Sequence, residues 1–339
     1  MISENELSQN KFNIELPKVI NANITIFNSD VIHNIIYLVQ ILRKYDNVFI
    51  PFQHFIQDKS IDMLTKLNEH NFYTTSFGNI IYQFLNTYTC RFFEFLPHLI
   101  LWRNIDTYYN YTDLDYYIKK TLRNSNVRFL LFKLTLIPQE TVVHANIIIY
   151  DKVQNKIERF EPYGATHSLM GDFKNLDIYL KNLFKKKINE NVKYLGPEDY
   201  MTDAKFQLVS SENDTKYRKY TDPVGYCLAW CFWFVELRLA NPDVESKILV
   251  DEAFQKIVNG KSNEIDNKDV TMNNINENML LSHIRNYSKK LDEYRISFYD
   301  EISINKSEYY KIRLSPENEE LIFSHIIESF NKLVNERYN

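Results

Sequence analysis

The sequence GYCLAWCFWFVELRL occupies residues 225–239, and the rest of the chain is arranged around it. Every position from 226 to 235 is apolar, so a helix built from this segment has no face suited to water until Glu236. The turn-forming stretch Asp222-Pro223-Val224-Gly225 comes directly before it. We therefore expect a central, buried helix that begins close to Cys227.

A cysteine at the start of a helix is a candidate nucleophile. The unpaired N–H groups and the positive end of the helix dipole favour a thiolate there. The same N–H groups can hold the oxyanion that forms when the sulfur attacks a carbonyl. The alternative for Cys227 is a thiol that only packs in the core. Cys231 lies one turn further along the same face, deeper in the apolar run, and we expect it only to pack.

A thiol nucleophile needs an imidazole to take its proton, and the imidazole needs a group that orients it. Of the eight histidines, only His144 opens an expected strand, in the stretch VVHANIIIY at 142–150. A polar turn at 151–156 and a second strand at 157–161 follow, which predicts a β-hairpin. Antiparallel pairing brings residues near 161 alongside 144, so we expect Glu161 to orient His144.

Gln207 is a fourth candidate, on a short strand expected at 204–209. Its side-chain amide could hold the oxyanion together with the Cys227 N–H, although a structural glutamine at a sheet edge is an equally good interpretation. Gly164 and Gly225 are two of only six glycines and flank these sites. We expect them where the backbone approaches a substrate closely.

The order His144, Glu161, Gln207, Cys227 resembles that of the cysteine proteases with a permuted papain-like fold. This group includes ubiquitin-like-protein-specific proteases, adenovirus-type maturation proteases and their relatives in large DNA viruses. The resemblance covers about 95–240. The stretches that carry the resemblance best are HANIIIYD (144–151), ERFEPYG (158–164) and GYCLAW (225–230).

The resemblance implies an α+β fold, in which a mixed or antiparallel sheet packs on the buried helix, with helical N- and C-terminal extensions. It also implies a thiol protease or isopeptidase with a Cys-His-Glu triad, acting on viral structural precursors or ubiquitin-like conjugates. The group typically places Gln a few residues before an Asp-Cys-Gly sequence. Here the two residues are 20 apart and Leu228 follows the cysteine, which a longer loop at 210–222 accounts for.

The chain is expected to contain three regions. Residues 1–84 form an extension packed on the core, since no Gly/Pro/Ser-rich linker follows them; residues 85–242 form the catalytic core, and 243–339 a helical C-terminal region. The apolar patterns predict these helices: 30–45, 59–70, 112–123, 172–188, 244–259, 272–290 and 316–336. They also predict strands at 48–51, 92–102 and 127–137.

Composition restricts the function classes. A net charge of −4 over 339 residues argues against nucleic acid as the main ligand. The longest apolar run is about 12 residues, too short to span a bilayer, and no N-terminal segment resembles a signal peptide. Three cysteines do not make a disulfide framework, so we expect a reducing compartment such as a host cytoplasm or a virion. We expect a protein substrate and no cofactor; the oligomeric state stays open.

Four other interpretations remain. Papain itself has its histidine after the cysteine, which would pair Cys227 with His283, but His283 lies in a helical pattern. Metal binding would need a second Cys/His pair with ligand spacing besides Cys227 and Cys231. An acyltransferase could use the same cysteine. An inactive virion or scaffold binding protein could keep the fold, with Cys227 and His144 out of reach of each other.

Overall fold

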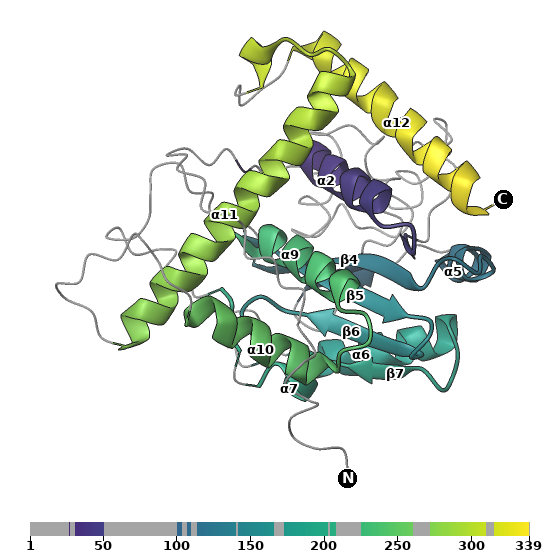
Figure 1. The fold of residues 1–339 in the computed structure, drawn as a ribbon. Coiled ribbons are helices and arrows are strands. Elements are labelled where there is room, and N and C mark those ends of the chain that lie inside the picture. Colours follow the sequence, from purple (N-terminus) through teal and green to yellow (C-terminus); the bar gives the residue numbers. More distant parts are fainter. Residues whose placement is uncertain are drawn as a thin grey trace.

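The structure is a computed structural model of the 339-residue chain (Figure 1). It describes residues 27, 31–50, 100–103, 107–109, 114–139, 142–165, 173–202, 204–207, 225–259, 272–309 and 315–338. The helix expected at 59–70 and most of the strand expected at 92–102 lie outside these residues.

A mixed seven-stranded sheet runs through the described residues, in the order β3-β2-β4-β5-β6-β7, with β1 paired to β4. Strands β4, β5 and β6 pair antiparallel, whereas β1 and β2 lie parallel to β4, and β7 lies parallel to β6. The strands are β1 (Val48–Phe49), β2 (Ile100–Arg103), β3 (Thr107–Tyr109), β4 (Phe129–Gln139), β5 (Val142–Asp151), β6 (Lys156–Phe160) and β7 (Lys193–Leu195).

The helices are α2 (Val31–Lys44), α5 (Leu114–Leu122), α6 (Phe173–Lys187), α7 (Pro197–Tyr200), α9 (Cys227–Ala240), α10 (Ser246–Val258), α11 (Met272–Glu301) and α12 (Pro316–Tyr338), with a 3-10 turn η4 (Lys306–Glu308). Helices α11 and α12 both contact α2. Side chains of α2, α9, β4 and β5 line one small cavity, so α2 packs on the sheet beside α9 (Figure 1). The chain therefore has the expected α+β class, with a mixed sheet packed on a buried central helix.

Helices α6 and α9 cover opposite faces of the sheet. Phe132 of β4 packs edge-on against Phe184 of α6, while Phe160 of β6 stacks on Phe234 of α9 with ring centroids 4.3 Å apart. Phe160 pairs with Ile147, and Ile147 pairs with Lys133, so these three side chains point to the same face of the sheet. Phe132 directly precedes Lys133 in β4 and therefore points to the opposite face. Helices α9 and α6 thus lie on different sides of the sheet.

Helix α9 is the buried centre that its sequence predicts. All residues from Leu228 to Leu239 are buried, including Glu236. Trp230 and Trp233 pack around Phe206, with ring centroids 5.3 and 5.0 Å from it. The apolar side chains of α9 are thus covered on one side by the sheet and on another by α11.

Several predicted bounds need correction. The helix expected at 272–290 continues to Glu301, because buried Leu291 and Phe298 extend its apolar face. No strand forms at 204–207, where the backbone bonds to a turn instead of a sheet edge. The hairpin turn is tighter than expected, since the strands on either side reach Asp151 and Lys156.

Candidate active site

Cys227 is the first residue of α9. The side chain of the capping residue, Tyr226, does not cap the helix, and the first bond within the helix runs from the Trp230 N–H to the Tyr226 carbonyl at 2.9 Å. The N–H groups of the first turn therefore have no partner within the helix and point out of its positive end. Cys227 is a free, partly exposed thiol at this position.

His144 joins Cys227 to Glu161. The imidazole Nε2 lies 2.6 Å from Glu161 Oε1, and both side chains are buried, at 2% and 0% exposure. The Cys227 thiol also interacts with the His144 ring and helps to raise its pKa. Because Nε2 faces the carboxylate, Nδ1 is the ring nitrogen left for the sulfur. The structure thus brings together three residues from β5, the end of β6 and the start of α9.

The hairpin register explains this contact. Ile147 pairs with Phe160, and continuing this register places Glu161 opposite Asn146 and His144 opposite Tyr163. Glu161 therefore reaches His144 diagonally, from a position two residues away from the directly opposite one. The sequence predicts this contact from the length of the hairpin. Tyr163 fills the directly opposite position, and its ring stacks on the imidazole at a centroid distance of 4.8 Å.

The protonation of the pair follows from these contacts. Burial disfavours the imidazolium, but the charge of Glu161 and the hydrogen bonds to Cys227 and Glu161 raise the pKa of His144 to about 10. Burial would raise the pKa of Glu161, yet the His144 charge and hydrogen bond and the Arg159 charge hold that pKa below its usual value. At neutral pH the site therefore contains an imidazolium held by an ionised carboxylate.

Gln207 is docked beside the Glu161 loop. Its N–H donates to the Pro162 carbonyl at 2.9 Å, and its side chain is 2% exposed. Gly164 has a φ of +79°, and a Cβ there would lie 2.8 Å from the Ala204 carbonyl oxygen. Gly164 therefore allows a close approach to the segment that carries Gln207, and an approach to a substrate stays a prediction. The oxyanion role of Gln207 stays a prediction.

The structure does not favour the papain order. His283 of α11 stacks on Trp230 and meets the edge of Trp233, at centroid distances of 5.7 and 5.5 Å. Burial lowers the pKa of His283 to about 3, and its Nε2 has no hydrogen-bond partner among the described residues. The imidazole that interacts with Cys227 belongs to His144.

Cys231 behaves as its place in the apolar run predicts. Its thiol donates to the Ala145 carbonyl at 3.4 Å, and burial raises its pKa well above the ordinary value. In the described part of the chain no three His, Cys, Asp or Glu side chains are grouped as metal ligands would be. No helix there is both long and apolar enough to cross a membrane.

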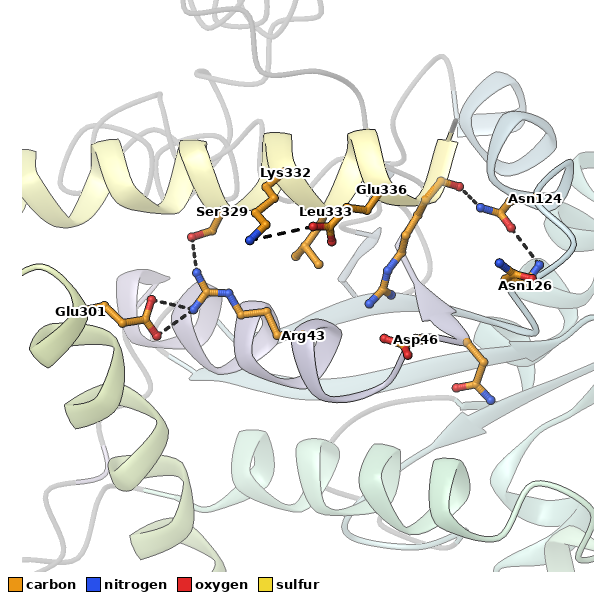
Figure 2. A pocket seen from close by; sticks show the side chains of 11 residues that line it. Arg43, Asp46, Asn124, Asn126, Glu301, Ser329, Lys332, Leu333 and Glu336 are labelled. Atoms are coloured by element: carbon orange, nitrogen blue, oxygen red, sulfur yellow. Dashed lines mark hydrogen bonds and ion pairs between the residues drawn. The ribbon is translucent and has the colours of Figure 1, made fainter.

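A polar pocket of about 870 Å³ lies elsewhere, between α2, α12 and the loop before β4. Figure 2 shows Arg43 held between Glu301 and Ser329, and Lys332 beside Glu336. These charged groups pair with one another, and none of the described residues that line the pocket is a Cys or a His. It therefore offers no nucleophile and base comparable to Cys227 and His144.

Comparison with known proteins places the chain near a viral relative. It is 26% identical over 211 residues to a putative ankyrin repeat protein of Acanthamoeba polyphaga mimivirus. The match covers 59% of this chain, which spans only 25% of that protein. No known family pattern and no solved structure matches the chain. Ankyrin repeats are stacked helix pairs, whereas residues 129–160 form antiparallel strands, so the sheet described above is a different kind of structure.

Proposed function

We propose that the protein is a thiol protease or isopeptidase with a permuted papain-like core and Cys227 as its nucleophile. The observation that carries this proposal is the buried His144–Glu161 hydrogen bond, whose imidazole also interacts with Cys227 at the first residue of a helix. A nucleophile, a base and a group that orients the base are what acyl transfer through sulfur requires.

In the proposed reaction the Cys227 sulfur attacks the carbonyl carbon of an amide bond. The carbonyl oxygen becomes an oxyanion, for which the Cys227 N–H and the Gln207 amide are the proposed donors. His144 has taken the thiol proton and gives it to the leaving amine when the carbon–nitrogen bond breaks. Water, deprotonated by the same imidazole, then hydrolyses the thioester and restores the thiol. Glu161 holds the ring throughout.

The substrate and the setting are part of the proposal. A protein substrate, either a viral structural precursor or a ubiquitin-like conjugate, fits the group that the chain resembles. The likeness to a mimivirus protein supports an origin among large DNA viruses. A reactive thiol is preserved best in a reducing compartment, such as a host cytoplasm or a virion.

The first test measures the alkylation rate of each cysteine by iodoacetamide against pH, mapped by mass spectrometry. An ordinary thiol is about 1% thiolate at pH 6.5, so a preformed thiolate at Cys227 should react about 10–100-fold faster than that. The rate should fall in His144→Ala. Buried Cys231 provides a control in the same molecule. If Cys227 reacts no faster than Cys231, or is unaffected by His144→Ala, the inert scaffold interpretation replaces catalysis.

A second experiment separates hydrolysis from transfer. The protein is incubated with ubiquitin carrying a C-terminal vinyl sulfone and, separately, with a peptide library and with acetyl-CoA. Covalent capture of the vinyl sulfone by Cys227, or peptide cleavage that is lost in Cys227→Ser, supports the protease. Acetylation of an added protein without cleavage favours an acyltransferase. Cleavage that persists in Cys227→Ser contradicts the proposed nucleophile.

A further inference from the structure

Glu161 is a buried carboxylate whose two oxygens are both occupied. Oε1 faces His144 Nε2 and also accepts the Tyr163 N–H at 3.1 Å. Oε2 accepts a hydrogen bond from Asn146 Nδ2 at 2.8 Å. Since Glu161 has no exposed surface, these donors replace the water that would otherwise keep it ionised.

Arg159 decides which way the Asn146 amide faces. Its Nη1 lies 2.6 Å from Asn146 Oδ1 and 3.8 Å from Glu161 Oε2. A guanidinium group only donates hydrogen bonds, so the amide oxygen must face Arg159. The NH2 group of the amide is then turned toward Glu161. The same NH2 group donates to the Ala145 carbonyl at 3.0 Å, so Arg159 reinforces an orientation that both acceptors favour.

Arg159 is itself held by α6, which covers this face of the sheet. Its Nε and Nη2 donate to the two oxygens of Asp177 on α6, at 2.7 and 2.9 Å. The Tyr194 hydroxyl donates to Asp177 Oδ1 at 2.6 Å. All three guanidinium nitrogens of Arg159 are thus engaged, two by α6 and one by Asn146. Bidentate pairing of this kind fixes orientation as well as charge.

We propose that Asn146 and Arg159 are positioning residues, which hold Glu161 ionised and aimed at His144 through a buried series of contacts anchored by Asp177. The inference rests on the proposed roles of Cys227 and His144. The sequence places Asn146 two residues after His144, on the same face of β5, which is the signal that could have identified it. Arg159 gives no such signal, because its partner lies on a separate helix.

The test uses the pH profile of Cys227 alkylation in the full chain, together with the titration of His144 followed by NMR of labelled histidine. Asn146→Ala removes the side-chain amide that donates to Glu161 Oε2, and Arg159→Lys removes the guanidinium group that contacts both Asp177 and the Asn146 amide. Both variants should let Glu161 turn away from His144. Loss of the hydrogen bond between the two should lower the pH at which His144 loses its proton by about one unit, since a hydrogen bond to a charged group is worth about that much. The alkylation midpoint of Cys227 should rise correspondingly.

Arg238→Lys is the matched control. Arg238 is also a buried arginine paired with a carboxylate of β6, Glu158, at 2.9 Å. Its other side-chain hydrogen bonds go to the carbonyls of Asn241 and Val244, at the opposite end of α9 from Cys227. Its alkylation profile should match that of the wild type. All variants are compared at a temperature well below their unfolding midpoints, so that global loss of structure does not enter.

Two failures are distinguishable. If the folded Asn146→Ala and Arg159→Lys variants keep the wild-type His144 titration, while wild-type Cys227 still depends on His144, the positioning inference is overturned and the proposed function stands. A shift of equal size in Arg238→Lys also overturns it, because the effect would then come from general loosening. If wild-type Cys227 does not depend on His144 at all, the proposed function itself fails.

Discussion

Replacing Glu236 by alanine is predicted to destabilise the protein without touching the candidate active site. Glu236 is the one acidic residue in the buried stretch of α9, and its side chain is 8% exposed. Lys44 and Lys290 approach its oxygens at 2.7 and 3.0 Å, and the hydroxyls of Tyr287 and Tyr294 donate to it at 2.7 and 3.1 Å. The carboxylate thus joins α9 to the end of α2 and to α11.

The magnitude follows from the burial of each partner. Tyr287 is 3% exposed, so its hydroxyl is left buried without its acceptor, which costs about 1–3 kcal/mol. The side chains of Lys44 and Lys290 are 43% and 32% exposed. They can turn to water, and each pair contributes about 0–1 kcal/mol. We expect Glu236→Ala to lower the free energy of unfolding by about 2–4 kcal/mol in total.

Urea unfolding followed by far-UV circular dichroism measures this change. Lys290→Ala is the control and should cost less than about 1 kcal/mol. Burial opposes ionisation of Glu236, but the Lys290 charge and the Lys44 hydrogen bond lower its pKa overall. The stabilisation that ionised Glu236 gives the folded state is therefore fully present above the unfolded-state pKa of about 4.3 and is lost as pH falls through the folded-state pKa. The reasoning is refuted if Glu236→Ala costs no more than Lys290→Ala, or if the gap between wild type and Glu236→Gln stays constant as pH falls well below 4.

Two further substitutions test other contacts. Gly164→Ala should cost about 1–3 kcal/mol in urea unfolding, because its φ of +79° disfavours a side chain and the new Cβ meets the Ala204 carbonyl; a neutral result would contradict this docking. His283 has a folded pKa of about 3 against about 6.5 when unfolded, so the unfolded state binds more protons between these values. Stability should fall by up to about 1.4 kcal/mol per pH unit below pH 6.5. His283→Phe, which keeps the stacking on Trp230, should remove that slope, and an unchanged slope would show that His283 titrates normally.

The features that the sequence predicts best are local. The start of α9 follows from turn residues directly before an apolar run, and the contact between His144 and Glu161 follows from a hairpin of known length. In both cases the residues concerned lie on one element or on two neighbouring strands. Backbone geometry alone then limits which side chains meet.

The features that the sequence does not predict depend on distant partners. The strand Lys156–Phe160 looks amphipathic, with Glu158 and Arg159 apparently suited to water, yet all five residues are buried. Arg159 is compensated by Asp177 of α6, and Glu158 by Arg238 of α9. Neither pairing follows from spacing along the chain, because each requires knowing which helix covers which face.

The expected catalytic core, residues 85–242, is predicted not to fold alone, because contacts from outside this range complete it. Cutting there removes β1, which pairs with β4, and removes every side-chain donor that the structure places on Glu236. Those donors are Lys44, Tyr45, Tyr287, Lys290 and Tyr294.

Such a fragment would also uncover the side of α9 on which Phe232 meets Tyr37 of α2 and Trp230 stacks on His283 of α11. Each large apolar side chain returned to water loses about 1.5–3 kcal/mol. That cost is a large part of the stability of a domain of this size. We expect the fragment to show no cooperative urea transition and no His144-dependent reactivity of Cys227, whereas the full chain shows both. A fragment that unfolds cooperatively and keeps that reactivity would mean that the terminal helices serve another purpose than completing the core around α9.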